Sequence, residues 1–184
     1  ILNQSLYLTC TLFILGPELI MNLITLKDLR AKRLTYNWET IYVGMEMAYF
    51  TIQAISDYAV ELMEGGINDE FINQLAWGVE DGDSSRILIE IKCHFNLVSE
   101  KNNDEYKLEN RKLRFVYLSK LNDEVTDDKK LLDEIEKFYD NQGYPEDMNT
   151  FIGYMPQDSY TNCKILILRF HEFLNLEGEQ LRLI

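Results

Sequence analysis

The chain has 184 residues, 46% hydrophobic and 27% charged, which is enough for one domain with a sizeable core and short for two. Lys and Arg total 18 and Asp and Glu total 31, so the formal net charge is −13. A surface of that sign repels nucleic-acid phosphates and anionic lipid headgroups. It favours a basic protein as partner over nucleic acid or a membrane, unless the acidity serves only solubility.

The first twenty residues contain an apolar run, Leu6 to Leu15, that ends at Gly16-Pro17. A secretory signal would carry Lys or Arg before the apolar run, but neither occurs before Lys27. The run is also too short to span a bilayer. We therefore expect the biological start at Met21, with residues 1–20 as extra upstream sequence. The alternative is a genuine N-terminal core helix.

Apolar residues recur at helical spacing through the first half of the chain, between turn and capping residues. The pattern predicts a basic amphipathic segment over 26–34 and a helix from Trp38 to about Ala48. A further helix is predicted to begin with a Thr51 cap and to end at Gly65-Gly66, and a shorter one to begin with an Asn68 cap and to end near Gly78. Asp83 or Ser84 then begins a helix that carries apolar residues to Val98. Residues 99–103 are predicted to form a loop.

The second half continues the helical pattern. It predicts a long helix over 108–121 with a charged outer face, one from a Thr126 cap to Gly143, and one that Pro145 opens and that ends near Met155-Pro156. The run Ile165–Leu168 suits a buried helix or a strand, and we favour a helix because Phe170, Phe173 and Leu174 continue the stripe. The sequence thus predicts an all-α fold, an irregular bundle of about eight helices built from helical hairpins, as a single domain over 21–184.

Charge is distributed unevenly along this pattern. No Lys or Arg occurs between Leu34 and Ser85, although the stretch is rich in carboxylates and aromatic rings. Carboxylates without counter-ions are available to a cationic partner, and aromatic rings supply contact area and cation–π sites. The candidate partner-binding residues are Trp38, Glu39, Tyr42, Glu46, Asp57, Glu61, Trp77, Glu80, Asp81 and Asp83. Taken singly, Trp38, Tyr42 and Trp77 are more typical of core residues.

Residues that could carry chemistry do not form a recognisable pattern. His94 and His171 are the only histidines, and neither CxxC nor HExxH spacing is present. The cysteines, Cys10, Cys93 and Cys163, are odd in number and far apart, so we expect reduced thiols in a cytoplasmic protein. Cys93 and Cys163 are expected in the core, with the histidines at its margin. No GxSxG elbow or phosphate-binding glycine loop occurs. We assign no catalytic residue, no metal site and no cofactor.

Four segments together resemble one small bacterial family, the domain of unknown function 2247. They are 37–39 (Asn-Trp-Glu), 55–62 (Ile-Ser-Asp-Tyr-Ala-Val-Glu-Leu), 75–77 (Leu-Ala-Trp) and 144–148 (Tyr-Pro-Glu-Asp-Met). The resemblance runs from about Met21 to the C-terminus and implies a bacterial cytosolic protein without an established activity. Some similarly small acidic bacterial families are immunity proteins for secreted toxins. The resemblance transfers no functional residue.

These observations predict a cytosolic binding protein, an immunity or antitoxin-like inhibitor that covers the cationic cleft of a basic toxin with its 34–85 face. One alternative is a helical regulatory adaptor without an inhibitory role, which would bind through an apolar groove and whose complex would tolerate salt. Another is a hydrolase with a divalent metal held by carboxylates.

Overall fold

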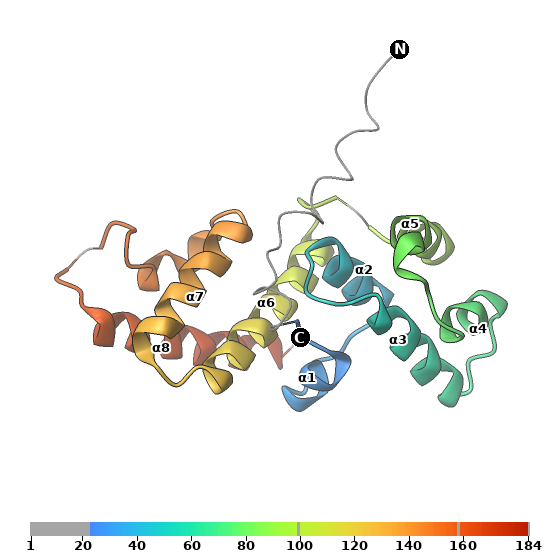
Figure 1. The fold of residues 1–184 in the computed structure, drawn as a ribbon, viewed down its shortest axis with the longest axis horizontal. Helices are drawn as coiled ribbons and strands as arrows, with labels where there is room; N and C mark the ends of the chain where they lie inside the picture. The colour runs from blue at the N-terminus through green and yellow to red at the C-terminus, as the bar shows by residue number, and fades with distance from the viewer. Residues whose placement is uncertain (1–22, 99, 158, 184) are drawn as a thin grey trace, which may run out of the picture.

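The computed structural model describes residues 23–98, 100–157 and 159–183, and the expectations for residues 1–20 and for a start at Met21 lie outside these ranges (Figure 1). The described residues form eight α-helices, two 3-10 helices and no strand, so the predicted all-α bundle is confirmed. The elements are α1 (Leu26–Ala31), α2 (Trp38–Glu46), α3 (Gln53–Glu64), α4 (Glu70–Ala76), η2 (Asp81–Asp83), α5 (Ser84–Phe95), α6 (Asp104–Glu124), α7 (Asp128–Asn141), η3 (Glu146–Phe151) and α8 (Cys163–Leu181).

Helix α6 is the central element of the bundle. Helices α1 and α2 contact one side of it and α7 and α8 the other, while α3, α4 and α5 form the end of the molecule away from α7 and α8 (Figure 1). Because both sides of α6 are covered, charged side chains such as Glu109, Lys112 and Arg114 are buried there. The prediction of a charged outer face is therefore wrong for much of this helix, whose charges are accommodated by pairing.

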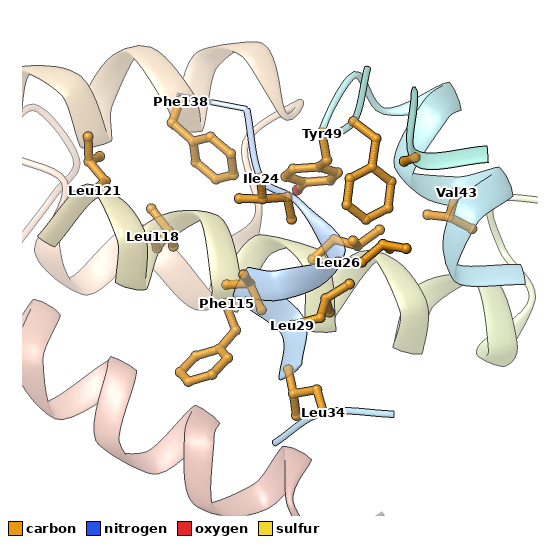
Figure 2. Close-up of a cluster of buried hydrophobic side chains, with 14 of the residues drawn as sticks. Ile24, Leu26, Leu29, Leu34, Val43, Tyr49, Phe115, Leu118, Leu121 and Phe138 are labelled. Atoms are coloured by element: carbon orange, nitrogen blue, oxygen red, sulfur yellow. The ribbon is translucent and has the colours of Figure 1, made fainter. Parts of the chain in front are cut away.

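The hydrophobic core is centred on the short helix α1 and the residues before it. Figure 2 shows Ile24, Leu26 and Leu29 between Val43 of α2, Phe115 and Leu118 of α6, and Phe138 of α7. The N–H of Ile24 also donates to the carbonyl of Tyr49 at 3.0 Å, which fixes the chain before α1 against the residues that follow α2. Contacts distant in sequence thus position α2, on which several candidate residues lie.

Most helix starts agree with the sequence pattern to within a residue or two, but α6 begins at Asp104, four residues before the predicted start at 108, and some caps differ from the prediction. Asp69 rather than Asn68 caps α4, and its carboxylate accepts from the N–H of Ile72 at 3.0 Å. Asp127 rather than Thr126 caps α7 in the same way. Ile52 precedes α3 without a side-chain cap, so the predicted Thr51 cap is not formed. In each case the observed N-cap is the residue that directly follows the predicted one.

The predicted helix after Pro145 is a short 3-10 helix, η3, that ends at Phe151 instead of near Met155. The chain beyond it is held by the amide of Gln157, whose Nε2 lies 3.2, 3.0 and 3.1 Å from the carbonyl oxygens of Asn149, Ile152 and Met155. Carbonyl groups that a longer helix would satisfy are therefore satisfied by one side chain.

Residues 165–168 lie within α8, so the choice of helix over strand is confirmed. Cys93 and Cys163 are exposed, and their expected core position is wrong. Cys93 is two residues beyond the buried Ile91 and faces away from that stripe, while Cys163 is the first residue of α8, ahead of the buried Leu166. None of the described helices is both long and apolar enough to span a bilayer.

Candidate functional site

The ten candidate residues do not share one surface. Trp38, Glu39 and Tyr42 are buried on α2, with Glu46 at the end of the same helix. Asp57 and Glu61 lie on α3. Trp77, Glu80, Asp81 and Asp83 lie between α4 and α5, and the side chain of Asp81 is outside the described part of the structure. The structure therefore divides the acidic, aromatic stretch into a buried group and an exposed group.

At the end of α2, the carboxylate of the exposed Glu46 is held by two phenols. Glu46 accepts hydrogen bonds from the hydroxyls of Tyr42 at 2.9 Å and of Tyr106 at 3.0 Å. Burial, more than the neighbouring carboxylate, raises the pKa of both tyrosines, so they remain neutral donors. This arrangement fastens the end of α2 to α6.

The start of α2 is fastened to α6 through charged side chains. The hydroxyl of Thr40 donates to Oε2 of Glu109 at 2.6 Å, and Nζ of Lys112 lies 2.7 Å from Oε1 of the same carboxylate. Lys112 also donates to the carbonyl of Thr35 at 3.0 Å. The side chains of Thr40, Glu109 and Lys112 thus all have polar partners, as a buried ion pair requires.

Glu39 precedes Thr40 on α2 and borders a hollow of about 240 Å³, which we call the Glu39 hollow. It is formed by α2, α3 and the segment between α5 and α6, and is lined by Asn37, Trp38, Glu39, Tyr58, Phe95, Asn96, Leu97, Val98 and Glu105. Glu39 is 3% exposed; its Oε2 accepts from the N–H of Val98 at 3.2 Å, and its Oε1 has no hydrogen-bond partner. Burial raises the pKa of Glu39 more than the bond from Val98 lowers it, and the charge of Glu105 adds to the rise.

The two acidic candidates on α3 have intramolecular partners. Glu61 pairs with Arg30 and accepts from the hydroxyl of Tyr36 at 2.5 Å. Asp57 accepts from Nε2 of Gln53 at 2.9 Å. The expectation that the carboxylates of the 34–85 stretch lack counter-ions is therefore wrong for Glu61, because the cation comes from α1, just outside the stretch.

Two members of the exposed group, Glu80 and Asp83, line a second hollow of about 310 Å³ between α4, η2 and α5. Glu80, Asp83, Arg86 and Glu90 line it together with apolar groups of Phe71, Leu75, Val79 and Ile87. Trp77 immediately precedes Gly78, which also lines the hollow, and it is 91% exposed. We call Trp77, Glu80, Asp83, Arg86 and Glu90 the Trp77 face.

The exposure of Trp77 corrects the expectation that this residue belongs to the core. The buried stripe of α4 is formed by Ile72 and Leu75, with Val79 partly buried beyond it. Trp77 follows Leu75 by two residues, which places it on the opposite side of the helix end. Trp38 and Tyr42 are buried as expected, at 7% and 6% exposure.

The electrostatics of the Trp77 face are acidic but partly neutralised. Arg86 lies 3.0 Å from Asp83 and 2.8 Å from Glu90, whereas Glu80 has no ion pair with any described residue. The face therefore contains three carboxylates and one guanidinium. Sequence reasoning missed Arg86 and Glu90, which come directly after the stretch; their spacing of four residues on a helix was the available signal.

The two histidines lie on different helices, α5 and α8. His94 lies 3.5 Å from Asp69 and its ring is 4.6 Å from that of Phe71, while His171 is 2.9 Å from Asn122. Within the ranges that the structure describes, no three His, Cys, Asp or Glu residues come together in a way that could hold a metal ion.

Comparison with known proteins identifies a family. The model of DUF2247, described as an uncharacterized protein conserved in bacteria, matches residues 26–178. None of the curated proteins and none of the solved structures matches the chain significantly. The matched segment runs from the first residue of α1 to within three residues of the end of α8, so it includes both hollows. The chain therefore belongs to the DUF2247 family of bacterial proteins.

Proposed function

We propose that this protein is a cytoplasmic binding protein that docks a basic partner protein on the Trp77 face. The observation that carries the proposal is Trp77 itself, whose side chain is 91% exposed and which immediately precedes Gly78, a residue that lines the acidic hollow. Tryptophan is enriched among the residues that dominate binding energies at protein interfaces. Covering it would remove roughly 150 Å² or more from water, about 4 kcal/mol at ~25 cal/mol per Å².

The surrounding charge supports a cationic partner. Three carboxylates and one guanidinium leave the Trp77 face net negative, and the whole chain carries a formal charge of −13. A Lys or Arg side chain of the partner can pair with Glu80 and lie on the indole ring of Trp77. Such a complex forms faster at low salt, because exposed charges steer the encounter and salt screens them.

We further propose that docking inhibits the partner, which would be a basic toxin whose cationic substrate cleft this acidic face covers. The support for inhibition is charge complementarity, since an acidic protein can occupy the cleft that a basic enzyme uses for an anionic substrate. An adaptor that binds through apolar contacts alone would form a complex that salt does not weaken.

The partner can be trapped through the exposed residue. Trp77 is replaced by the photo-crosslinking analogue p-benzoylphenylalanine in cells that naturally produce the protein, and crosslinked proteins are identified by mass spectrometry. The matched control carries the analogue at Tyr160, an aromatic residue that is 86% exposed and precedes α8. We expect one basic protein to crosslink at position 77 and not at position 160. Equal crosslinking at both positions, an acidic partner or no crosslink at position 77 would refute the proposal.

Two variants then test the chemistry and the inhibition with the trapped partner. Glu80→Lys should lower its association rate at low salt, whereas Glu179→Lys, at an exposed residue of α8, should change it far less. The partner alone should arrest growth, and the wild-type chain should restore growth better than Trp77→Ala. A partner that leaves growth unaffected would refute inhibition while leaving the docking proposal intact.

A further inference from the structure

We infer that the Glu39 hollow is a second binding site, which takes the cationic end of a basic amino acid, a guanidinium or ammonium group carried together with a carbonyl oxygen. The inference does not rest on docking at the Trp77 face, because the two hollows have no lining residue in common. It comes from three features of the hollow: unpartnered polar atoms on residues that line it, an aromatic wall and a negative charge.

Two residues that line the hollow carry a polar atom without a partner, one an acceptor and the other a donor. Glu39 is 3% exposed and Trp38 is 7% exposed, and both line the hollow. Oε1 of Glu39 and Nε1 of Trp38 make no hydrogen bond. Buried polar atoms almost always have a partner, because leaving one unpaired costs about 1–3 kcal/mol. A basic amino acid supplies both partners: N–H groups for the carboxylate and a carbonyl oxygen for the indole N–H.

The aromatic wall gives the hollow a fixed shape. The ring of Trp38 stacks on that of Phe95 at 4.7 Å with planes 13° apart, and the ring of Tyr58 meets Trp38 edge-on at 4.8 Å. Three rings from α2, α3 and α5 therefore hold one another in place. The aliphatic stem of a Lys or Arg side chain is well suited to pack against such a wall while its charged end reaches a carboxylate.

Charge selects a cation over a neutral group. Two carboxylates, those of Glu39 and Glu105, line the hollow, and no Lys, Arg or His does. Glu46 and Glu109 lie close enough to act on the charge of Glu39, although Glu109 is itself paired with Lys112. The one hydrogen bond that Glu39 receives, from the N–H of Val98, is uncharged, so half of this buried carboxylate has no compensation.

Size and access fit a single side chain. A volume of about 240 Å³ is below the roughly 300–1,000 Å³ of sites for drug-sized ligands. Both unpartnered atoms have almost no surface exposed to solvent, so a ligand reaches them only when the rim shifts. The rim includes Asn96, which has a left-handed backbone at φ 51° and ends α5. Leu97 and Val98 follow it outside any helix, which allows that segment to move more readily than the helices.

The test uses the two tryptophans as reporters. The full chain contains only Trp38 and Trp77, so a proton–nitrogen NMR spectrum shows two indole N–H signals, and Trp77→Phe assigns them. The probe is N-acetyl-arginine amide, titrated at constant ionic strength against N-acetyl-citrulline amide, which has the same shape without the charge. Free arginine forms a separate arm, because tighter binding of the free amino acid indicates a metabolite, and tighter binding of the capped form indicates a residue of a protein.

We expect a saturable shift of the Trp38 signal with capped arginine, little shift of the Trp77 signal, and no saturable shift with capped citrulline. Glu39→Gln should weaken binding about tenfold or more, since it removes a charge-assisted hydrogen bond. Glu105→Gln, on an exposed residue, should weaken it several-fold and keeps the test decisive if Glu39→Gln does not fold. Glu179→Gln is the control that should leave binding unchanged. Equal shifts with citrulline, no saturable shift with either arginine, or unchanged binding in Glu39→Gln or Glu105→Gln would overturn the inference.

Discussion

Replacing Lys112 with methionine tests whether the buried charges hold α2 on α6. In the wild-type chain Nζ of Lys112 lies 2.7 Å from Oε1 of Glu109 and 3.0 Å from the carbonyl oxygen of Thr35. Both side chains are almost fully buried, with 9% and 5% of their surface exposed. Methionine has a similar length and fills the space, but it leaves the carboxylate of Glu109 with Thr40 as its only described partner.

The expected loss follows from that uncompensated charge. Removing one member of a buried ion pair costs about 3–5 kcal/mol, because the remaining charge stays desolvated. That is a large part of the 5–15 kcal/mol over which single domains are typically stable. At about 2–4 °C per kcal/mol for a chain of this size, the Tm should fall by roughly 6–20 °C. Removing both charges together, in Glu109→Leu with Lys112→Met, should cost only about 1 kcal/mol, since no buried charge remains.

Urea unfolding followed by circular dichroism measures these changes. Lys107→Met is the matched control on the same helix, because its ammonium is exposed and 4.0 Å from Asp104; its effect should stay within about 0.5 kcal/mol. The reasoning is refuted if Lys112→Met costs less than about 1 kcal/mol, or if the double variant is as unstable as the two single changes added together. Either result would mean that water reaches the pair and screens it.

Two further predictions concern Gly44 and Glu39, which both lie on α2. A Cβ at Gly44 would lie 2.2 Å from Cδ2 of the buried Phe50, so Gly44→Ala should destabilise by about 1–2 kcal/mol in urea despite alanine's better helix propensity, whereas Gly82→Ala meets no atom within 4 Å and should not. Because the pKa of Glu39 is raised in the folded state, its contribution to stability is complete below its ordinary value of 4.5 and lost as pH rises through the folded-state pKa. Glu39→Gln mimics the protonated form, so unfolding measured across pH should show the variant gaining on the wild type as pH rises; a difference independent of pH would contradict this.

The helices were predictable because their apolar stripes are local. In α8 the ambiguous run Ile165–Leu168 was settled by Phe170 and Phe173, which continue a spacing that a strand does not produce. The end of the helix after Pro145 was not predictable, because the side-chain amide of Gln157 donates to three backbone carbonyl oxygens in place of a further helical turn. A single glutamine that bonds to backbone carbonyl oxygens leaves no periodic signal in the sequence.

The burial of charges depended on tertiary structure. Glu109 and Lys112 are three residues apart on α6, a spacing equally typical of an exposed helix face. Only the position of α6 between two sets of helices makes the pair a buried one (Figure 1). Trp77, in contrast, could have been placed from the sequence, because it lies two residues beyond Leu75 and off the stripe that continues to Val79.

The division of the acidic stretch bears on whether acidity serves only solubility. Carboxylates that merely keep a protein soluble would be solvated and well separated from large apolar groups. In this chain Glu39 is buried and lines a hollow together with Trp38, and Glu80 lines a partly apolar hollow and follows the exposed Trp77 by three residues. An exposed indole lowers solubility and adds nothing to the core, so solubility does not account for its position. The proposed recognition of cationic groups would account for both placements, and crosslinking at position 77 and the arginine titration followed at Trp38 test them independently.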